Sequence, residues 1–331
     1  MLNTDVHIKE NIFDTPDTAA TRDGFGLGLV QAADADPRVV ALSADLTEST
    51  RVEDFKKKYP AQFVEVGVAE QNLAALASGF AAYGKVPFIT SYAAFNPGRN
   101  NEQIRTTISL NQQHVVICGM HAGVSVGPDG ATHQALEDMA LMRMQPHMTV
   151  ISPCDSEEAR KATLAAAAHN GPIYMRFGRE KTPIMTTSET PFEIGKANVM
   201  WKSDSPHCVI FATGALLHNA LLAARELENG GVAVTVVNIH TIKPLDRETI
   251  LRESKAAGAV VTVEEHQIAG GLGSAIAELL AAESPAPIEF IGVHDEFGQS
   301  GTPNELIEHY GMGVSHIVAA VQKVITRKFA K

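Results

Sequence analysis

The acidic side chain of Glu70 stands at a junction between two kinds of sequence pattern. The short apolar run Phe63–Gly67 predicts a strand, and the small-residue run that follows it predicts a helix. Glu70, with Gln71 and Asn72 beside it, falls in the first turn of that helix. Unpaired N–H groups and the helix dipole stabilise a carboxylate there. Residue type and position alone are therefore explained by the electrostatics of a helix start.

A second group of polar residues lies in the glycine-rich stretch 121–134, HAGVSVGPDGATHQ. It contains His121, Asp129 and His133 and directly follows an apolar run. A single histidine is usually structural or solvated. Three such groups in one long loop are more typical of a functional loop.

The pattern along the first half of the chain predicts the framework that positions these residues. Apolar strands and helices alternate from Thr21 to Phe177, which is typical of a mostly parallel sheet with helices on both faces. Ligands on such sheets gather at the carboxyl ends of the strands. We therefore expect one rim to collect the polar groups at or just beyond strand ends: Asp45, Gly67–Glu70, Tyr92–Phe95, His121 and Arg176–Arg179.

The alternation stops in a Thr-, Ser- and Pro-rich stretch over 181–200 and then restarts. Strands are expected at 207–213, 232–239, 259–265 and 287–293, with helices between and after them. The fold class is therefore α/β, with two consecutive, mostly parallel-sheet domains at 1–187 and 201–331 and a linker at 188–200. Residues 1–19 read as an irregular arm.

Composition excludes several classes of function. The 331 residues are 45% hydrophobic, enough for two cores, and the net charge of −11 argues against a nucleic-acid surface. No apolar run approaches a membrane span, and the polar N-terminus has no signal-peptide pattern. Three isolated cysteines fit free thiols in a reducing cytoplasm.

Several nucleotide- and metal-binding motifs were tested and rejected. Gly79–Val86 nearly spells a phosphate-binding loop but ends in Val and runs from helix to strand. Gly24, Gly26 and Gly28 do not spell GxGxxG. The GGLGS segment at Gly270–Ser274 opens a helix and could bind an anion, although tight packing explains it better. No metal-ligand spacing is present, so no metal site is predicted on this chain.

The segment VGVAEQN with its small-residue helix resembles the pyrimidine-binding domain of transketolases. The resemblance implies that Glu70 contacts the aminopyrimidine ring of thiamine diphosphate and shares a proton with it, for which a half-buried carboxyl without a cationic partner would suit. It also implies that Tyr92 and Phe95 form the aromatic wall and that Asp45, in SADLTES, lies near the thiazolium ring. No further aromatic follows Phe95 in Asn96–Asn101, which departs from the family pattern.

The same resemblance implies the substrate contacts. Asp129 and the catalytic candidate His133 would hydrogen-bond sugar hydroxyls. A distal phosphate or sulfonate would be held by Arg22, Ser49, His121 and Arg179, with Arg176 as an alternative to Arg179.

The second half resembles the C-terminal domain of transketolases, through Ile239–Asp246 and Val261–Ala275. The GDG…N motif, which in the family holds Mg²⁺ and the diphosphate, is missing. The chain therefore resembles the C-terminal subunit of a split transketolase. The implied partner is a separate N-terminal subunit carrying that motif and Mg²⁺, and two copies of each chain would form a closed heterotetramer.

The resemblance implies transfer of a two-carbon ketol unit from a ketose to an aldose. Three alternatives stay open at the level of sequence. Deoxyxylulose-phosphate synthase has loops similar to Asp129–His133 and Arg176–Arg179 but uses pyruvate. The beta subunit of a 2-oxoacid dehydrogenase is a separate chain of the same kind. The third alternative is a scaffold that lacks the cofactor.

Overall fold

Two sheets organise the chain in the computed structural model, which describes residues 1–329. The first sheet has seven strands in the order β12-β6-β7-β5-β4-β2-β3. Six are parallel to one another: β2 (Val39–Ser43), β3 (Phe63–Glu65), β4 (Val86–Tyr92), β5 (Val116–Met120), β6 (Thr149–Ile151) and β7 (Ile173–Arg176). The predicted parallel sheet and its carboxyl-end rim are therefore present.

Successive side chains on the strands of this sheet pack into two separate cores, one on each face. On β5, Val116 and Cys118 belong to a core with Phe25 and Phe88, whereas Ile117 belongs to a core with Leu73. Both faces are covered, as the near-continuous apolar strands require. The helices of this domain are α1 (Thr21–Ala35), α2 (Glu53–Lys58), α3 (Glu70–Ala82), α4 (Asn101–Gln103), α5 (Asp138–Arg143) and α6 (Ser156–Ala167).

The glycines of α1 serve helix packing. A Cβ on Gly24 would lie 1.8 Å from the carbonyl oxygen of Ser156, and one on Gly28 would lie 2.8 Å from that of Arg160. Both neighbours belong to α6. These glycines therefore allow α1 to pack closely on α6, which a residue with a Cβ would prevent. Their packing role agrees with the absence of a nucleotide-binding motif.

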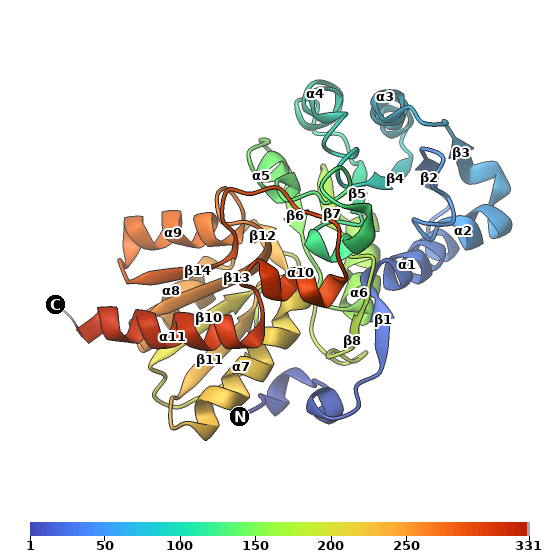
Figure 1. Ribbon diagram of the computed structural model, residues 1–331. Coiled ribbons are helices and arrows are strands. Elements are labelled where there is room, and N and C mark those ends of the chain that lie inside the picture. The colour runs from blue at the N-terminus through green and yellow to red at the C-terminus, as the bar shows by residue number, and fades with distance from the viewer. Residues whose placement is uncertain (330–331) are drawn as a thin grey trace.

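The second domain is built on a five-stranded sheet ordered β14-β13-β10-β11-β9. Its strands are β9 (Asn198–Trp201), β10 (Cys208–Ala212), β11 (Val234–Asn238), β13 (Val260–Gln267) and β14 (Ile288–Val293), of which β9 alone is antiparallel to its neighbour. Helices α7 (Leu217–Asn229), α8 (Arg247–Ala257), α9 (Leu272–Glu283), α10 (Pro303–His309) and α11 (Val314–Phe329) surround it. Figure 1 shows the two domains as adjoining lobes.

Two strands lie where the sequence pattern did not predict them. Strand β12 (Thr241–Lys243) leaves the second domain and pairs with β6, at the edge of the first sheet. Strand β9 begins at Asn198, so the second sheet already starts inside the predicted linker 188–200. Both strands are three or four residues long, too short to show a period of two.

The N-terminal arm, predicted to be irregular over residues 1–19, contains short helical turns and a strand. It forms two short helical turns, η1 (Thr4–Val6) and η2 (Glu10–Phe13), and the strand β1 (Thr18–Ala20), which pairs with β8 (Lys181–Pro183). Ile12 is buried in the core of the second domain, and Phe13 lies edge-on to Trp201 at 6.0 Å between ring centroids. The arm therefore runs from the second domain to the first (Figure 1).

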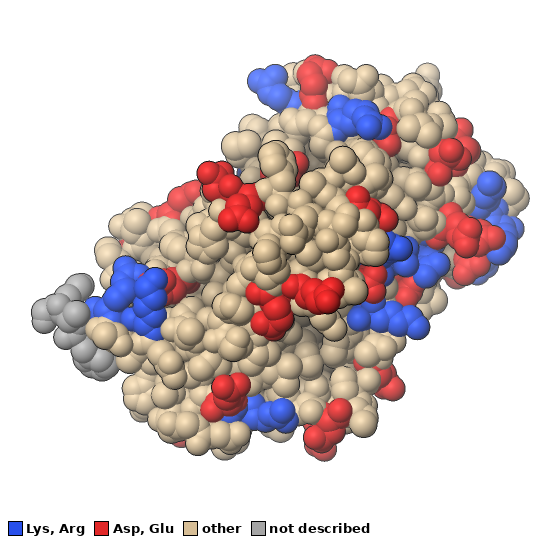
Figure 2. Space-filling model, viewed as in Figure 1, with Lys and Arg blue, Asp and Glu red and all other residues tan. Residues whose placement is uncertain are grey.

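The surface matches the acidic composition. Acidic and basic side chains are interspersed on the face shown in Figure 2, without a continuous basic area. Among residues 1–329, no helix combines the length and the apolarity needed to cross a bilayer.

Candidate active site

Glu70 is the first residue of α3, and its carboxylate points inward. The residue is 1% exposed. Its Oε1 accepts a hydrogen bond from the hydroxyl of Ser91 at 3.0 Å, and its Oε2 accepts one from Nη1 of Arg99 at 2.9 Å. Ser91 comes from β4, next to the end of that strand. The carboxylate is therefore fixed between a helix start and a strand end.

Two features of Glu70 differ from the expectation. It is fully buried where a half-buried carboxyl was expected, because α3 packs its start against β4. It also has a cationic partner, since Arg99 follows Phe95 by one helical turn, with the Arg99 N–H donating to the Phe95 carbonyl at 2.9 Å. The segment Asn96–Asn101, which lacks a further aromatic, supplies this arginine.

Asn96 and Asn100 hold that segment in place. The amide of Asn100 donates to the carbonyl oxygen of Glu70 at 3.0 Å and to the side chain of Asn96. Asn96 in turn donates to the carbonyls of Ile89 and Cys118. Both asparagines are buried, so they have a structural function in the wall beside Glu70.

The aromatic residues predicted to line the site form one continuous cluster. The rings of Tyr92 and Phe95 stack at 6.1 Å, and the ring of His133 lies edge-on to Phe95 at 5.4 Å and to Tyr92 at 6.0 Å. His133 thus reaches the aromatic wall from the glycine-rich loop. The faces of the aromatic rings could stack on an aromatic ring of a ligand. The imidazole at their edge could form hydrogen bonds with polar groups of the same ligand.

His121, Arg22 and Ser49 meet beyond this wall. Nη1 of Arg22 donates to Nε2 of His121 at 2.8 Å and to the carbonyl oxygen of Ser49 at 2.9 Å. Because Arg22 donates to Nε2, the ring proton of neutral His121 lies on Nδ1, which has no hydrogen-bond partner in the described structure. Nε of Arg22 is also unpartnered. Both nitrogens are therefore buried donors without a partner among the described residues.

Electrostatics keep His121 uncharged. Burial, together with the charges of Arg22 and Arg179, lowers its pKa to about 3. Burial and the neighbouring arginines likewise lower the pKa of Arg22 from its usual range. The influence of Arg179 on both groups places three basic side chains around one region that suits an anion.

Asp129 and Arg179 form an ion pair with each other. Nη1 of Arg179 lies 3.3 Å from Oδ2 of Asp129 and donates to the carbonyl of Val126 at 3.0 Å. Both side chains are about one-third exposed. The pair ties the glycine-rich loop to the segment after β7 and leaves both side chains within reach of a ligand.

Arg176, the sequence-level alternative to Arg179, has a different function. It is buried and donates through Nε to Asp138 at 2.9 Å and through Nη2 to the carbonyl of Glu265 at 2.8 Å. Tyr174 also donates to Asp138. Arg176 therefore joins β7, α5 and β13 inside the molecule, and its Nε and Nη2 donate to groups of the chain itself.

Asp45 lies on the same rim, just beyond β2. Its N–H donates to Oε1 of Glu65 at 2.7 Å, and its backbone is left-handed with φ 59°. His121 is also left-handed, with φ 54°. Non-glycine residues in this conformation cluster at functional sites. No hydrogen bond joins the Asp45 side chain to the aromatic cluster within residues 1–329.

Three residues of this region were missed from the sequence: Ser91, Arg99 and Glu65. Glu65 accepts hydrogen bonds from Asp45, Thr47 and Gly67 and shapes the loop after β2. The spacing Phe95–Arg99, i to i+4, was the one available signal for Arg99, because a helical turn would bring the two side chains together.

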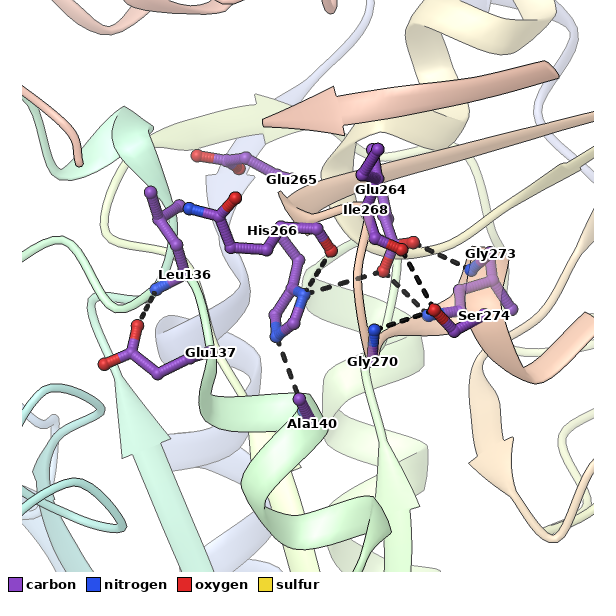
Figure 3. Close-up of polar contacts among 12 residues, drawn as sticks. Leu136, Glu137, Ala140, Glu264, Glu265, His266, Ile268, Gly270, Gly273 and Ser274 are labelled. Atoms are coloured by element: carbon purple, nitrogen blue, oxygen red, sulfur yellow. Dashed lines mark hydrogen bonds and ion pairs between the residues drawn. The ribbon is translucent and has the colours of Figure 1, made fainter. Parts of the chain in front are cut away.

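In the GGLGS segment, the chain's own carboxylate occupies the helix start. Glu264 accepts the N–H groups of Leu272 and Gly273 at the start of α9, both at 2.7 Å. Figure 3 shows the contact with Gly273. Burial raises the pKa of Glu264 to about 7. The adjacent His266 ring accepts the N–H of Ala140 in α5. The anion position is therefore filled by the chain itself, and the packing interpretation of this segment holds.

The chain matches two domain families in succession. Residues 17–185 match the transketolase pyrimidine binding domain, and residues 195–317 match the transketolase C-terminal domain.

Individual relatives fall into two length classes. The chain is 38% identical, over 93% of its length and 95% of the relative's, to a 6-deoxy-6-sulfo-D-fructose transketolase subunit of Clostridium sp. (strain MSTE9). It is 36% identical to a transketolase of Mus musculus, of which it spans only half the length. The chain thus matches some relatives end to end and covers about half of the longer ones.

The structural comparison agrees. A solved structure described as a split gene transketolase, inactive beta4 tetramer, superimposes with a TM-score of 0.87 at 43% identity, covering 93% of this chain and 99% of that one.

Proposed function

The chain belongs to the transketolase family, and we propose that it is the pyrimidine-binding and C-terminal half of a two-subunit, thiamine-diphosphate-dependent transketolase. The reaction is transfer of a two-carbon ketol unit from a ketose to an aldose. One observation carries the assignment to this site. Through Arg99, Glu70 connects to the Tyr92–Phe95 wall, and that wall contacts His133 and the Arg22–His121 pair along one rim of the sheet.

The residues present fit one end of the cofactor. Glu70 presents a buried carboxylate, and the Arg99 side chain that contacts it also lies over the Phe95 ring. A carboxylate and an aromatic face that share one neighbour suit an aromatic ring that carries a basic nitrogen, and Asp45 lies on the same rim. When bound, thiamine diphosphate supplies the nucleophilic thiazolium carbon. In this proposal Glu70 shares a proton with the aminopyrimidine nitrogen, and Ser91 holds the carboxylate in position for that transfer.

The diphosphate end and Mg²⁺ belong to the partner subunit in this proposal. The sequence has no GDG motif, and the described residues contain no group of three acidic, histidine or cysteine side chains that could hold a metal ion. The half-length relatives support a separate N-terminal chain.

The other rim residues handle the sugar. In this proposal, His133 and Asp129 form hydrogen bonds with the hydroxyl groups of the sugar. His133, at the edge of the aromatic wall, is also the candidate for proton transfer to and from those hydroxyl groups. His121 donates through its free Nδ1–H as a neutral imidazole, and Arg22 and Arg179 contact the distal anion. Ser49 contributes its carbonyl oxygen to the position of Arg22.

The exposed face of α3 is the proposed subunit interface. Val68 and Tyr83, at its two ends, are 71% and 91% exposed, and Ala75, Leu76, Gly79 and Ala82 are exposed between them. The exposed residues of α3 are mostly apolar, with Gln71 and Asn72 exposed in its first turn, and Glu70 is on the same helix. A partner seated there would lie next to the cofactor site, and two copies of each chain would give closed symmetry.

The cell compartment that fits this proposal is the cytoplasm. The three cysteines, Cys118, Cys154 and Cys208, are buried free thiols that form no disulfide. Free thiols of this kind suit a reducing environment.

Reconstitution tests the proposal. Three samples are compared: the purified chain, an N-terminal transketolase subunit, and the two mixed. Each is assayed with thiamine diphosphate and Mg²⁺ for ketol transfer between a ketose phosphate and an aldose phosphate, and for CO₂ release from pyruvate. We expect ketol transfer from the mixture alone. Ketol transfer by the isolated chain, or pyruvate decarboxylation by the mixture, would contradict the proposal.

A further inference from the structure

The guanidinium group of Arg99 makes two contacts at once beside Glu70. Its Nη1 donates to Oε2 of Glu70 at 2.9 Å, and its Cζ lies 4.6 Å from the centroid of the Phe95 ring. The helical turn from Phe95 to Arg99 fixes this arrangement, because it places both side chains on one side of the segment. A flat cationic group therefore stacks on an aromatic ring while it donates a hydrogen bond to a buried carboxylate.

These are the two contacts that the proposed function gives to the aminopyrimidine ring. Guanidinium is planar, stacks on aromatic faces and offers N–H donors in its plane, so it satisfies the same two partners. We propose that Arg99 occupies the position of the aminopyrimidine ring while the subunit is empty, and that the cofactor must displace it. The inference rests on the proposed function and adds a residue that controls cofactor entry.

The two residues of this ion pair differ in solvent exposure. Glu70 is 1% exposed and held by the start of α3, whereas the side chain of Arg99 is 49% exposed. A buried carboxylate without a cationic partner is unfavourable, so Arg99 stabilises the empty site. Because half of the arginine already faces solvent, it can rotate outward and leave Glu70 and Phe95 to the cofactor.

A displaced occupant lowers the apparent affinity of the incoming ligand. Only the fraction of molecules with Arg99 turned away is competent to bind, and a fraction near one tenth would weaken the apparent Kd about tenfold. Removing Arg99 should therefore tighten cofactor binding while it weakens the empty subunit. Most substitutions in a binding site weaken ligand binding, so tighter binding after removal of Arg99 would be a distinctive result.

The test compares wild type, Arg99→Met, Arg99→Gln and Arg105→Met in the complex with the partner subunit. Thiamine diphosphate is titrated by calorimetry at fixed Mg²⁺, and the melting temperature of the cofactor-free chain is measured separately. Arg105 is exposed on the adjoining helical segment and serves as the control. We expect both Arg99 variants to melt lower when empty and to bind the cofactor roughly threefold to tenfold more tightly. Arg105→Met should match wild type in both measurements.

The outcomes separate this inference from the proposed function. Weaker cofactor binding by both Arg99 variants would show that Arg99 belongs to the cofactor's own site, and unchanged binding would show that it does not compete. Either result overturns the inference and leaves the proposed function intact, since wild type still binds. A wild-type complex that binds no thiamine diphosphate would overturn both.

Discussion

The imidazole ring of His121 stacks on the ring of Tyr92, with 4.1 Å between centroids and 24° between planes. Tyr92 comes from the end of β4, and His121 follows the end of β5, the neighbouring parallel strand. This contact joins the aromatic wall near Glu70 to the arginines at the other end of the site. The predictions below probe the two ends separately.

Glu70→Gln should abolish most turnover of the reconstituted enzyme. Glutamine keeps the size and the contact with Ser91 but cannot share a proton, and such groups typically contribute about 10²–10⁴-fold in rate. Steady-state kinetics of ketol transfer would measure the loss. The control is Glu193→Gln, which changes an exposed carboxyl between the two domains and should leave turnover unchanged. Normal turnover of Glu70→Gln with a lowered melting temperature would show that Glu70 only stabilises the helix start.

Arg179→Ala should impair anionic substrates selectively. Loss of one charge-assisted contact to a phosphate costs about 1.5–3 kcal/mol, or roughly a tenfold to hundredfold rise in KM. The measurement compares a sugar phosphate with its dephosphorylated analogue. Arg247→Ala, at an exposed ion pair in the second domain, is the control. Equal losses on both substrates would indicate that Arg179 supports only the glycine-rich loop through Asp129.

Arg176→Met should lower stability without selecting among substrates. The change leaves the Asp138 carboxylate buried without its cationic partner, and breaking such a pair costs about 3–5 kcal/mol. Urea unfolding of the isolated chain would measure the loss. The double variant Arg176→Met with Asp138→Asn removes the stranded charge and should recover part of the stability. A selective loss on phosphorylated substrates would instead assign Arg176 to the anion site.

Ala75→Arg should prevent assembly with the partner subunit. The side chain lies on the exposed apolar face of α3, where a long charged group is accommodated in the isolated chain but not in a close helix interface. Size-exclusion chromatography with light scattering would show the missing complex. Ala281→Arg introduces the same group on the exposed side of α9 and should assemble normally. Normal assembly of Ala75→Arg would move the interface elsewhere.

His240→Gln should flatten the acid dependence of stability. Burial lowers the pKa of His240 to about 3 in the folded chain, far below the usual histidine pKa of about 6.5. The folded state therefore binds fewer protons, and its stability is present above pH 6.5 and is lost as the pH falls from there toward 3. One such group contributes a slope of up to about 1.4 kcal/mol per pH unit.

Urea unfolding between pH 7 and pH 4 would measure this slope. His309→Gln, which replaces an exposed imidazole, is the control. An unchanged slope for His240→Gln would show that other buried groups account for the acid sensitivity.

The sequence by itself determined the parts of this protein that depend on local pattern. The helices at Thr21 and Glu70 and the buried strands β2, β4 and β5 follow from apolar periodicity, and the position of each strand end placed Asp45, Tyr92 and His121 on one rim. The parallel sheet then brings those ends together without further information.

The tertiary structure alone decided which partners these residues have. The full burial of Glu70 and its contact with Ser91 arise from the packing of α3 on β4, between residues 21 positions apart. The choice between Arg176 and Arg179 depended on Asp138, which comes from a separate helix. Strand β12 crosses into the first sheet through pairing with β6, about 90 residues earlier in the chain. Such long-range contacts leave no period in the sequence, because each depends on how separate elements pack.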